Sequence, residues 1–173
     1  MSGKLTGQQI AARTAVVASI LAIVAMWIYG FGFAPDKPVA QVDDSSWSTR
    51  AEEICKVRND LLDQNAEQAL AVSDGGPQDL GQAVKSATDI IEDALDEVLA
   101  VRPKSERDVR LVDQWEELYR LYIADRREVE QRLLSGEAVE LNETTLNGSP
   151  VSLTIDDFTK HNRMTACSAP SGR

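Results

Sequence analysis

Apolar residues recur at helical spacing along most of this chain. Within residues 47–72, 77–101 and 105–135, apolar side chains return every three or four positions, which is the period of one face of an α-helix. Short turn-rich stretches separate the three segments. The pattern therefore predicts an all-α domain with three long helices that run up, down and up as an antiparallel bundle, with the first and third helices as neighbours.

Turn and capping residues mark the ends of these helices. Thr49 and Glu52 have the spacing of a capping box, so we expect them at the start of the first helix. A Ser-Asp-Gly-Gly stretch ends that helix, and Pro77 suits the first turn of the next. Ser105 is expected to cap the third helix, and Gly136 to follow its end.

Two polar residues, Arg58 and Asn65, interrupt the apolar stripe of the first helix. A buried arginine needs a partner, which acids on the facing helices could supply. Otherwise its stem packs on the core with its charged end at the surface, or the two residues bind an anionic ligand inside the bundle. A cavity of about 300 Å³ or more beside them would favour the ligand. The apolar residues expected to face the core are Trp47, Ala51, Ile54, Leu61, Leu62, Ala69 and Val72 in the first helix, Val84, Ala87, Ile91, Ala94, Leu95 and Val98 in the second, and Val109, Val112, Trp115, Tyr119, Tyr122, Val129 and Leu133 in the third.

The pattern changes over residues 137–153, which are rich in Thr, Asn and Val. Asn147-Gly148 is a turn signal, and the segment is interpreted as an irregular excursion with a small hairpin. A short fourth helix is expected to begin at Thr154, with Leu153 and Phe158 in contact across its first turn.

The N-terminal residues have a different character, because residues 14–34 contain no charge. About 20 helical residues cross a hydrocarbon core of roughly 30 Å, and a cleavable signal sequence would have a shorter apolar stretch. Lys4 and Arg13 precede the span without any acid, which places the N-terminus in the cytoplasm. The predicted organisation is a cytoplasmic segment (1–13), a single transmembrane helix (14–34), a polar linker (35–46) and an extracytoplasmic helical domain (47–173).

Cys55 and Cys167 are the only cysteines, and both follow the predicted span. Because disulfides persist outside the membrane, we expect a bridge that ties the short C-terminal segment back to the first helix. Their α-carbons should then lie about 4.4–6.8 Å apart. Two free thiols are the alternative, whereas a metal site lacks its usual ligand spacing.

The composition argues against several classes of function. The chain has 28 acidic and 18 basic side chains, a net charge of −10, so it should repel nucleic acid. It contains no recognised catalytic or phosphate-binding motif. His161, with Asp156 and Asp157 nearby, is interpreted as polar surface rather than a metal or acid–base cluster. We therefore expect neither an enzyme nor a bound cofactor.

Three motifs resemble a group of actinobacterial membrane-anchored proteins with one N-terminal span, an extracytoplasmic helical domain and no assigned function. They are W-x3-A-E-x-I-C, W-x-E-L-Y followed by A-D-R-R, and D-F followed by H-N-R-M-x-x-C-x-x-P. The resemblance implies a bacterial cell envelope and supplies no catalytic residue. Its marks in this sequence are Trp47, Cys55, Trp115, Arg126, Phe158, Asn162, Met164 and Cys167.

These expectations favour an interaction or scaffold module in the cell envelope without catalytic activity. Its partners would be membrane lipid, contacted by the N-terminal helix, and another membrane or envelope protein. An extracytoplasmic ligand-binding or sensing bundle is the alternative.

Overall fold

The structure is a computed structural model that describes residues 40–72, 75–139 and 142–170. Contacts divide the chain into residues 1–37 and a unit of residues 38–173, and every described residue belongs to the second unit. The expected cytoplasmic segment and transmembrane helix (14–34) lie outside the described residues. No helix in the described part of the chain is long and apolar enough to cross a membrane.

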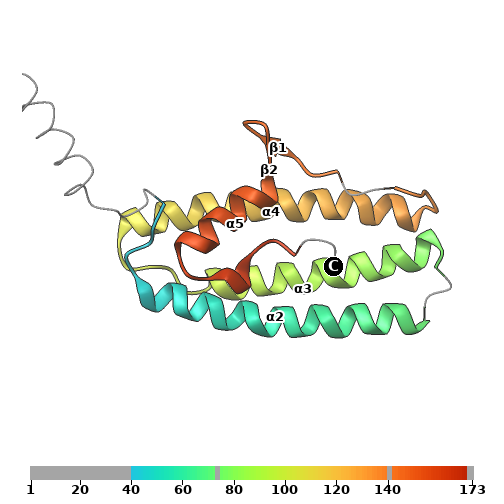
Figure 1. The fold of residues 1–173 in the computed structure, drawn as a ribbon, viewed down its shortest axis with the longest axis horizontal. Helices are drawn as coiled ribbons and strands as arrows, with labels where there is room; N and C mark the ends of the chain where they lie inside the picture. Colours follow the sequence, from blue (N-terminus) through green and yellow to red (C-terminus); the bar gives the residue numbers. More distant parts are fainter. Residues whose placement is uncertain (1–39, 73–74, 140–141, 171–173) are drawn as a thin grey trace, which may run out of the picture. The chain divides into compact units, whose positions relative to one another are not determined.

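The described unit is a helical bundle with a small hairpin, which confirms the all-α class (Figure 1). Its three long helices run antiparallel, and the hairpin and a short helix follow them. The elements are α2 (Ser45–Val72), α3 (Pro77–Leu99), α4 (Glu106–Leu134), β1 (Thr145–Leu146), β2 (Ser149–Pro150), α5 (Val151–His161) and the 3-10 turn η1 (Thr165–Cys167).

Several predicted helix ends are confirmed. Pro77 is the first residue of α3. The Ser105 hydroxyl caps α4 by accepting a hydrogen bond from the backbone N–H of Asp108 at 3.0 Å. Gly136, which follows α4, has a φ of +92°, a left-handed conformation that glycine adopts without strain.

The start of α2 differs from the prediction. The helix begins at Ser45, because the Asp44 carboxylate accepts a hydrogen bond from the backbone N–H of Ser46 at 3.2 Å. Thr49 therefore lies inside the helix, where its hydroxyl donates to the Ser45 carbonyl at 2.9 Å. The predicted capping box is wrong, since an acid further upstream performs the capping.

The hairpin is confirmed, but the start of α5 is not. Asn147 and Gly148 form its turn with φ values of +53° and +85°. Helix α5 begins at Val151, directly after the second strand, so Thr154 does not cap it. Leu153 lies within the helix and is 57% exposed, and the predicted contact with Phe158 is therefore wrong.

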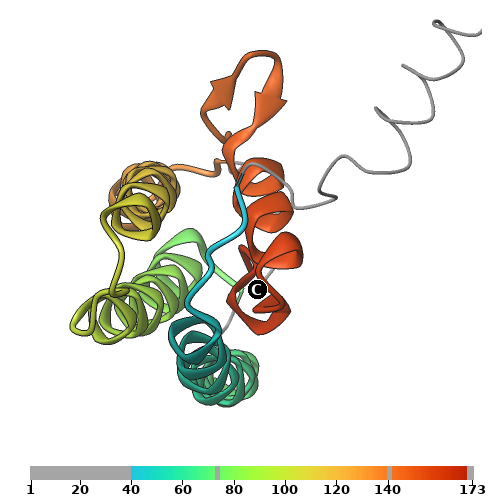
Figure 2. The same ribbon diagram turned by 90° about the vertical axis from the view of Figure 1, so that its left-hand side faces the viewer.

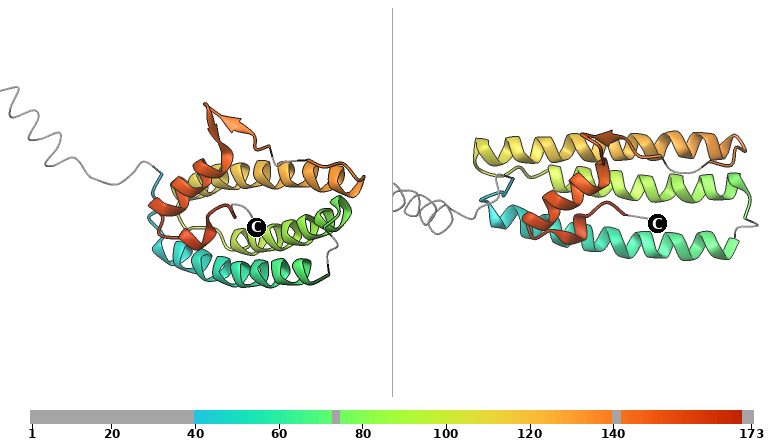
Figure 3. Two further views of the ribbon diagram at one scale, coloured as in Figure 1. Left: turned by 45° about the vertical axis from the view of Figure 1, so that its right-hand side comes forward. Right: turned by 45° about the horizontal axis from the view of Figure 1, so that its top comes forward.

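The C-terminal segment fills the fourth corner of the bundle, which corrects the expectation that the first and third helices are neighbours. Helix α3 packs against both α2 and α4. Seen end-on, α5 and η1 lie between α4 and α2 (Figure 2), and the oblique views show the same segment beside the long helices (Figure 3). Helix α5 packs on α4, and η1 packs on α2. This arrangement buries apolar side chains such as Ile155 and Met164, which have no other surface to cover them.

Aromatic side chains occupy the centre of the core. Trp115 is buried, as predicted, and its ring lies 5.0 Å from that of Tyr119 and 5.8 Å from that of Phe158. The Trp47 ring of α2 packs edge-on against the Trp115 ring, with 6.1 Å between the ring centres. Side chains of α2 and α4 therefore meet across the core even though the C-terminal segment separates the two backbones at one side.

Part of the expected linker (35–46) belongs to the domain. The Asn162 side-chain oxygen accepts from the backbone N–H of Val42 at 2.7 Å, and its amide nitrogen donates to the Ala40 carbonyl at 3.0 Å. Val42 is itself buried. The domain therefore includes Ala40 and does not begin at residue 47. The side-chain amide of Asn162 forms hydrogen bonds with backbone groups that were expected to face solvent.

A second residue holds the same segment from α4. The buried carboxylate of Asp108 accepts hydrogen bonds from the backbone N–H groups of Asp43 and Asp44, both at 3.1 Å. Residues far apart in the sequence therefore fix the entry of the chain into α2.

Candidate functional site

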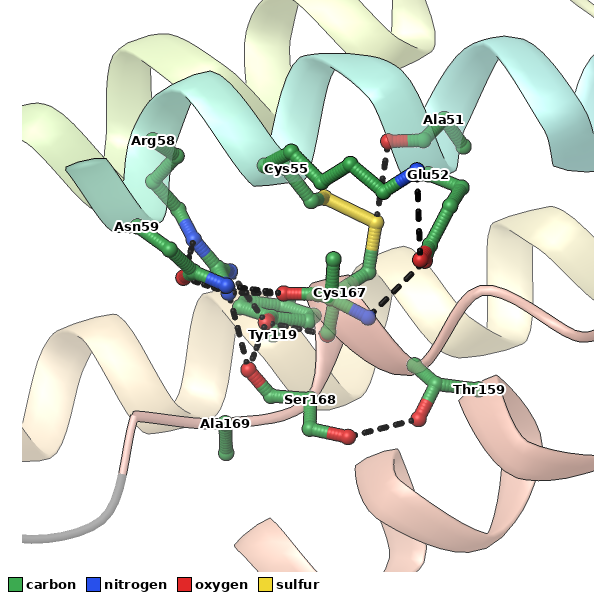
Figure 4. Close-up of a disulfide and its surroundings, with 12 residues drawn as sticks. Ala51, Glu52, Cys55, Arg58, Asn59, Tyr119, Thr159, Cys167, Ser168 and Ala169 are labelled. Carbon is green, nitrogen blue, oxygen red and sulfur yellow. Dashed lines mark hydrogen bonds and ion pairs between the residues drawn. A yellow bond between two sulfur atoms is a disulfide. The ribbon is translucent and has the colours of Figure 1, made fainter.

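The predicted disulfide between Cys55 and Cys167 is present, with an α-carbon separation of 5.0 Å (Figure 4). This distance falls within the expected range. Both cysteines are buried, and no cysteine is free in the described residues. The bridge joins α2 to the end of η1 and so holds the C-terminal segment against the bundle.

Arg58 lies one turn beyond the disulfide on α2, and its guanidinium is buried against the C-terminal segment (Figure 4). One terminal nitrogen donates to the Tyr119 hydroxyl at 2.9 Å. The other donates to the backbone carbonyls of Ala166 and Ser168, the latter at 3.1 Å. The Asn59 side-chain oxygen accepts from the same guanidinium at 2.9 and 3.1 Å.

Tyr119 links this arginine to the disulfide-bonded segment. Its hydroxyl accepts from Arg58 and donates to the Cys167 carbonyl at 2.6 Å. Burial raises the pKa of Tyr119 to about 12, although the positive charge of Arg58 opposes that rise. The hydroxyl is therefore protonated at neutral pH and acts as a structural donor rather than as a base.

Acids of the facing helices were one of the alternatives for the partners of Arg58, and the structure shows other partners. Its contacts in the described chain are carbonyl, hydroxyl and amide oxygens, and no described carboxylate oxygen lies within 4 Å of its guanidinium. A planar guanidinium presents several N–H donors at fixed angles, so one side chain can hold two neighbouring carbonyls. Arg58 therefore fastens the C-terminal segment beside the disulfide.

Carboxylates hold the N–H groups of the same segment. Glu52 accepts from the backbone N–H of Ala166 at 2.8 Å, and Asp156 accepts from that of Ala169 at 2.9 Å. Side chains from α2, α4 and α5 thus satisfy a stretch of backbone that has no regular partner strand or helix. The sequence had suggested other roles for both carboxylates, a capping box for Glu52 and polar surface for Asp156, because backbone N–H partners leave no mark in a sequence.

Asn65 does not share a site with Arg58. It is half-buried two turns further along α2, where its amide nitrogen donates to the Ala83 carbonyl of α3 at 3.3 Å. The two polar interruptions of the stripe therefore serve different contacts: Arg58 holds the C-terminal segment, and Asn65 joins α2 to α3.

The depression beside Arg58 is smaller than a usual ligand pocket. Its volume is about 230 Å³, and it is open to solvent, whereas ligand pockets are about 300 Å³ or larger. A broader hollow of about 710 Å³ is lined by residues of α4 alone and is a shallow surface feature. The residues around the first depression are Arg58, Asn59, Thr165, Ala166, Ser168, Ala169 and Pro170, and Asn65 is not among them.

A second buried arginine, Arg126, lies further along α4 and was missed as a site residue. Its Nε donates to the Thr88 hydroxyl at 3.2 Å, and its guanidinium lies 5.7 Å from the centre of the Tyr122 ring. The Tyr122 hydroxyl in turn donates to the Pro170 carbonyl at 2.7 Å. The spacing of Tyr119, Tyr122 and Arg126 on one helix face was the available signal.

His161 and its neighbouring acids form no compact cluster. The ring nitrogen Nδ1 lies 2.8 Å from the Asp157 carbonyl and 3.4 Å from the Asp157 carboxylate, at the partly exposed end of α5. Within the ranges that the structure describes, no group of three or more His, Cys, Asp or Glu side chains is placed to hold a metal ion.

No protein-family model, curated protein or solved structure matches this chain. The resemblance to actinobacterial membrane-anchored proteins therefore stays a prediction from the sequence motifs alone.

Proposed function

We propose that this protein is an interaction or scaffold module of the bacterial cell envelope, anchored in the membrane and exposed outside it, and that it functions without catalysis. One observation carries the proposal: the polar side chains of the candidate site bind one another and the chain's own backbone, whereas large apolar side chains remain at the surface. In the described part of the chain, the large apolar residues that are exposed are Val57, Leu61, Leu70, Leu80, Val101, Leu121 and Leu153.

The way the domain is held together supports a role in binding. Asn162 and Asp108 fix the start of α2, and the disulfide and Arg58 fix the C-terminal segment. A preorganised surface loses little conformational entropy when a partner binds. A domain whose two ends are fastened in this way is suited to present a constant surface.

The location rests on the sequence and on the disulfide. The uncharged residues 14–34 supply a membrane anchor with the N-terminus in the cytoplasm. A buried disulfide is typical of proteins in oxidising compartments. Membrane lipid and a second membrane or envelope protein are the proposed partners, and the acidic domain argues against nucleic acid.

A ligand-binding or sensing bundle is the second candidate. The observation in its favour is the polar depression beside Arg58. Its volume of about 230 Å³ and the engagement of the Arg58 guanidinium with carbonyl oxygens favour the interaction module instead.

Two experiments test this proposal. External protease added to spheroplasts should digest the domain, and complete protection would contradict the orientation. After chemical cross-linking, the intact protein purified in mild detergent should carry a defined membrane or envelope protein. A control chain that keeps residues 1–39 and carries an unrelated domain should lose that partner. Recovery of the same proteins with both chains would contradict a role for the helical domain.

A further inference from the structure

The acidic residues of α3 fall into two groups with different surroundings. On the side that faces α4, Asp89 and Glu92 lie 2.6 and 2.9 Å from Arg127, and Asp96 lies 2.5 Å from Arg120. The hydrogen bond that Arg120 donates to the Asp96 carboxylate raises the pKa of Arg120 above its ordinary value. Two arginines from α4, spaced seven residues apart, therefore neutralise this edge of α3.

The side of α3 that faces α2 has no such ion pairs in the described part of the chain. Arg58 of α2 lines this side, but its guanidinium is engaged by the Tyr119 hydroxyl and by carbonyls of the C-terminal segment. Asp93 and Glu97 lie one helical turn apart there, and within the described residues neither has a cation within 4 Å. They border a groove of about 140 Å³ between α2 and α3. The groove is lined by Ile54, Val57, Arg58, Leu61, Ile90, Asp93, Ala94 and Glu97.

The floor of this groove exposes apolar side chains. Val57 is 60% exposed and Leu61 is 44% exposed, whereas the adjacent Leu62 is 1% exposed. Both Leu61 and Leu62 were expected in the core, and this is confirmed for Leu62 and wrong for Leu61. The α2–α3 edge thus combines uncovered apolar surface with unneutralised acids.

We infer that the α2–α3 groove docks an amphipathic helix of a partner protein that carries arginine or lysine residues along the edges of its apolar face. Its apolar face would cover Val57 and Leu61, and its cations would lie beside Asp93 and Glu97. Helix α4 already binds the other edge of α3 in this manner through Arg120 and Arg127. The inference rests on the proposed function and names the chemical class of the partner.

The charges argue against two other occupants. A second copy of this chain, packed groove to groove about a two-fold axis, would bring four carboxylates, Asp93 and Glu97 of each copy, into one interface. An anionic lipid surface would be repelled by the same carboxylates. A basic partner would avoid this repulsion, and its cations would neutralise the two carboxylates.

A designed peptide provides the test. The full-length protein is placed in nanodiscs of zwitterionic lipid, with empty discs as the blank. The probe is a labelled helical peptide of about 18 residues, roughly 27 Å long, made of Leu, Ala and Arg, with arginines four positions apart to match Asp93 and Glu97. We expect saturable binding that weakens with added salt. Leu61→Asp, and the double change Asp93→Lys with Glu97→Lys, should each weaken it at least about tenfold.

The matched control is Leu70→Asp, since Leu70 is 83% exposed on the same helix but does not line the groove. Its affinity should stay within about twofold of the wild type. Absence of saturable binding, equal binding by all variants, or equal binding of a peptide with Glu in place of Arg would overturn the inference. Self-association of the wild type that Leu61→Asp abolishes would assign the groove to a second copy instead.

The outcome for the groove can be separated from that for the proposed function. If cross-linking recovers the same envelope partner from wild type and from Leu61→Asp, the interaction module stands and the groove is the wrong surface. Circular dichroism and thiol labelling are the controls that check whether each variant keeps its helices and its disulfide.

Discussion

Arg58 on α2 donates a hydrogen bond to the hydroxyl of Tyr119 on α4 across 2.9 Å, at the place where the C-terminal segment passes between the two helices. The Arg58 guanidinium also donates hydrogen bonds to two carbonyls of that segment, and the Tyr119 hydroxyl donates to a third. The contact therefore joins three parts of the chain at one point, next to the disulfide.

Replacement of Arg58 should destabilise the domain substantially. Arg58→Met keeps much of the buried stem but removes the guanidinium donor from the carbonyls of Ala166 and Ser168. In the described chain, these carbonyls then keep only the bonds from the Asn59 amide and the Tyr119 hydroxyl, each at 3.1 Å, and we expect a loss of about 2–4 kcal/mol in urea unfolding. Arg58→Lys should recover only part of this stability, because an ammonium group cannot reproduce the planar set of N–H donors of a guanidinium. Arg50→Met, at an exposed position of α2, should change the free energy by less than about 0.5 kcal/mol. Equal stability of Arg58→Met and wild type would contradict this role.

Loss of the disulfide should release the C-terminal segment and leave the long helices formed. Cys55→Ser with Cys167→Ser should cost about 2–4 kcal/mol, and the chain-entropy model sets about 4.8 kcal/mol for a loop of this length. Far-ultraviolet circular dichroism should change little, since α2, α3 and α4 lie outside that segment. Reductant should destabilise the wild type and not the double variant. Two reactive thiols in the denatured, unreduced protein would show that the bridge does not form.

Alkaline pH should weaken the fold through Tyr119. Burial raises the pKa of its hydroxyl to about 12, against about 10 in the unfolded chain. The folded state keeps this proton longer, so its contribution is complete below about pH 10 and is lost as the pH rises towards 12. Between these values the free energy of unfolding should fall by up to about 1.4 kcal/mol per pH unit. Tyr119→Phe should show a shallower slope in urea unfolding, and an identical slope would exclude this origin.

Asn162 should control how firmly the start of the domain is held. Asn162→Ala removes the acceptor of the Val42 N–H and the donor to the Ala40 carbonyl. Hydrogen exchange at the Val42 amide should accelerate by about tenfold or more, which corresponds to about 1.4 kcal/mol of local opening. Asn142→Ala, at an exposed position, is the control. Unchanged exchange at Val42 would mean that the contact does not restrain this segment.

Local signals in the sequence predicted much of the fold. The caps at Ser105 and Pro77, the turn at Asn147 and the central position of Trp115 each depend on nearby residues. The start of α2 and the fourth corner of the bundle were wrong. The first error came from a local signal that was overlooked, since Asp44 caps the helix upstream of Thr49. The fourth corner depends on which segment covers the remaining apolar surface, and periodicity carries no information about that choice.

The candidate site was only partly predictable for a related reason. The disulfide and the inward position of Arg58 followed from spacing and compartment. The partners of Arg58 did not, because two of the four are backbone carbonyls, and every residue carries a carbonyl. Asn162 and Asp108 were missed as anchors because their partners are backbone groups more than 60 positions away.

Site-specific photo-cross-linking of the full-length protein in living cells tests the central claim that this domain is an interaction module. A photoreactive residue is placed in turn at Val57, Leu121 and Leu153, and at the exposed polar positions Gln114 and Glu128 as controls. We expect a photoreactive residue at one or more of the apolar positions to form a discrete adduct with one membrane or envelope protein, and the control positions to form none. Adducts at no apolar position, or the same adducts at apolar and control positions, would contradict it.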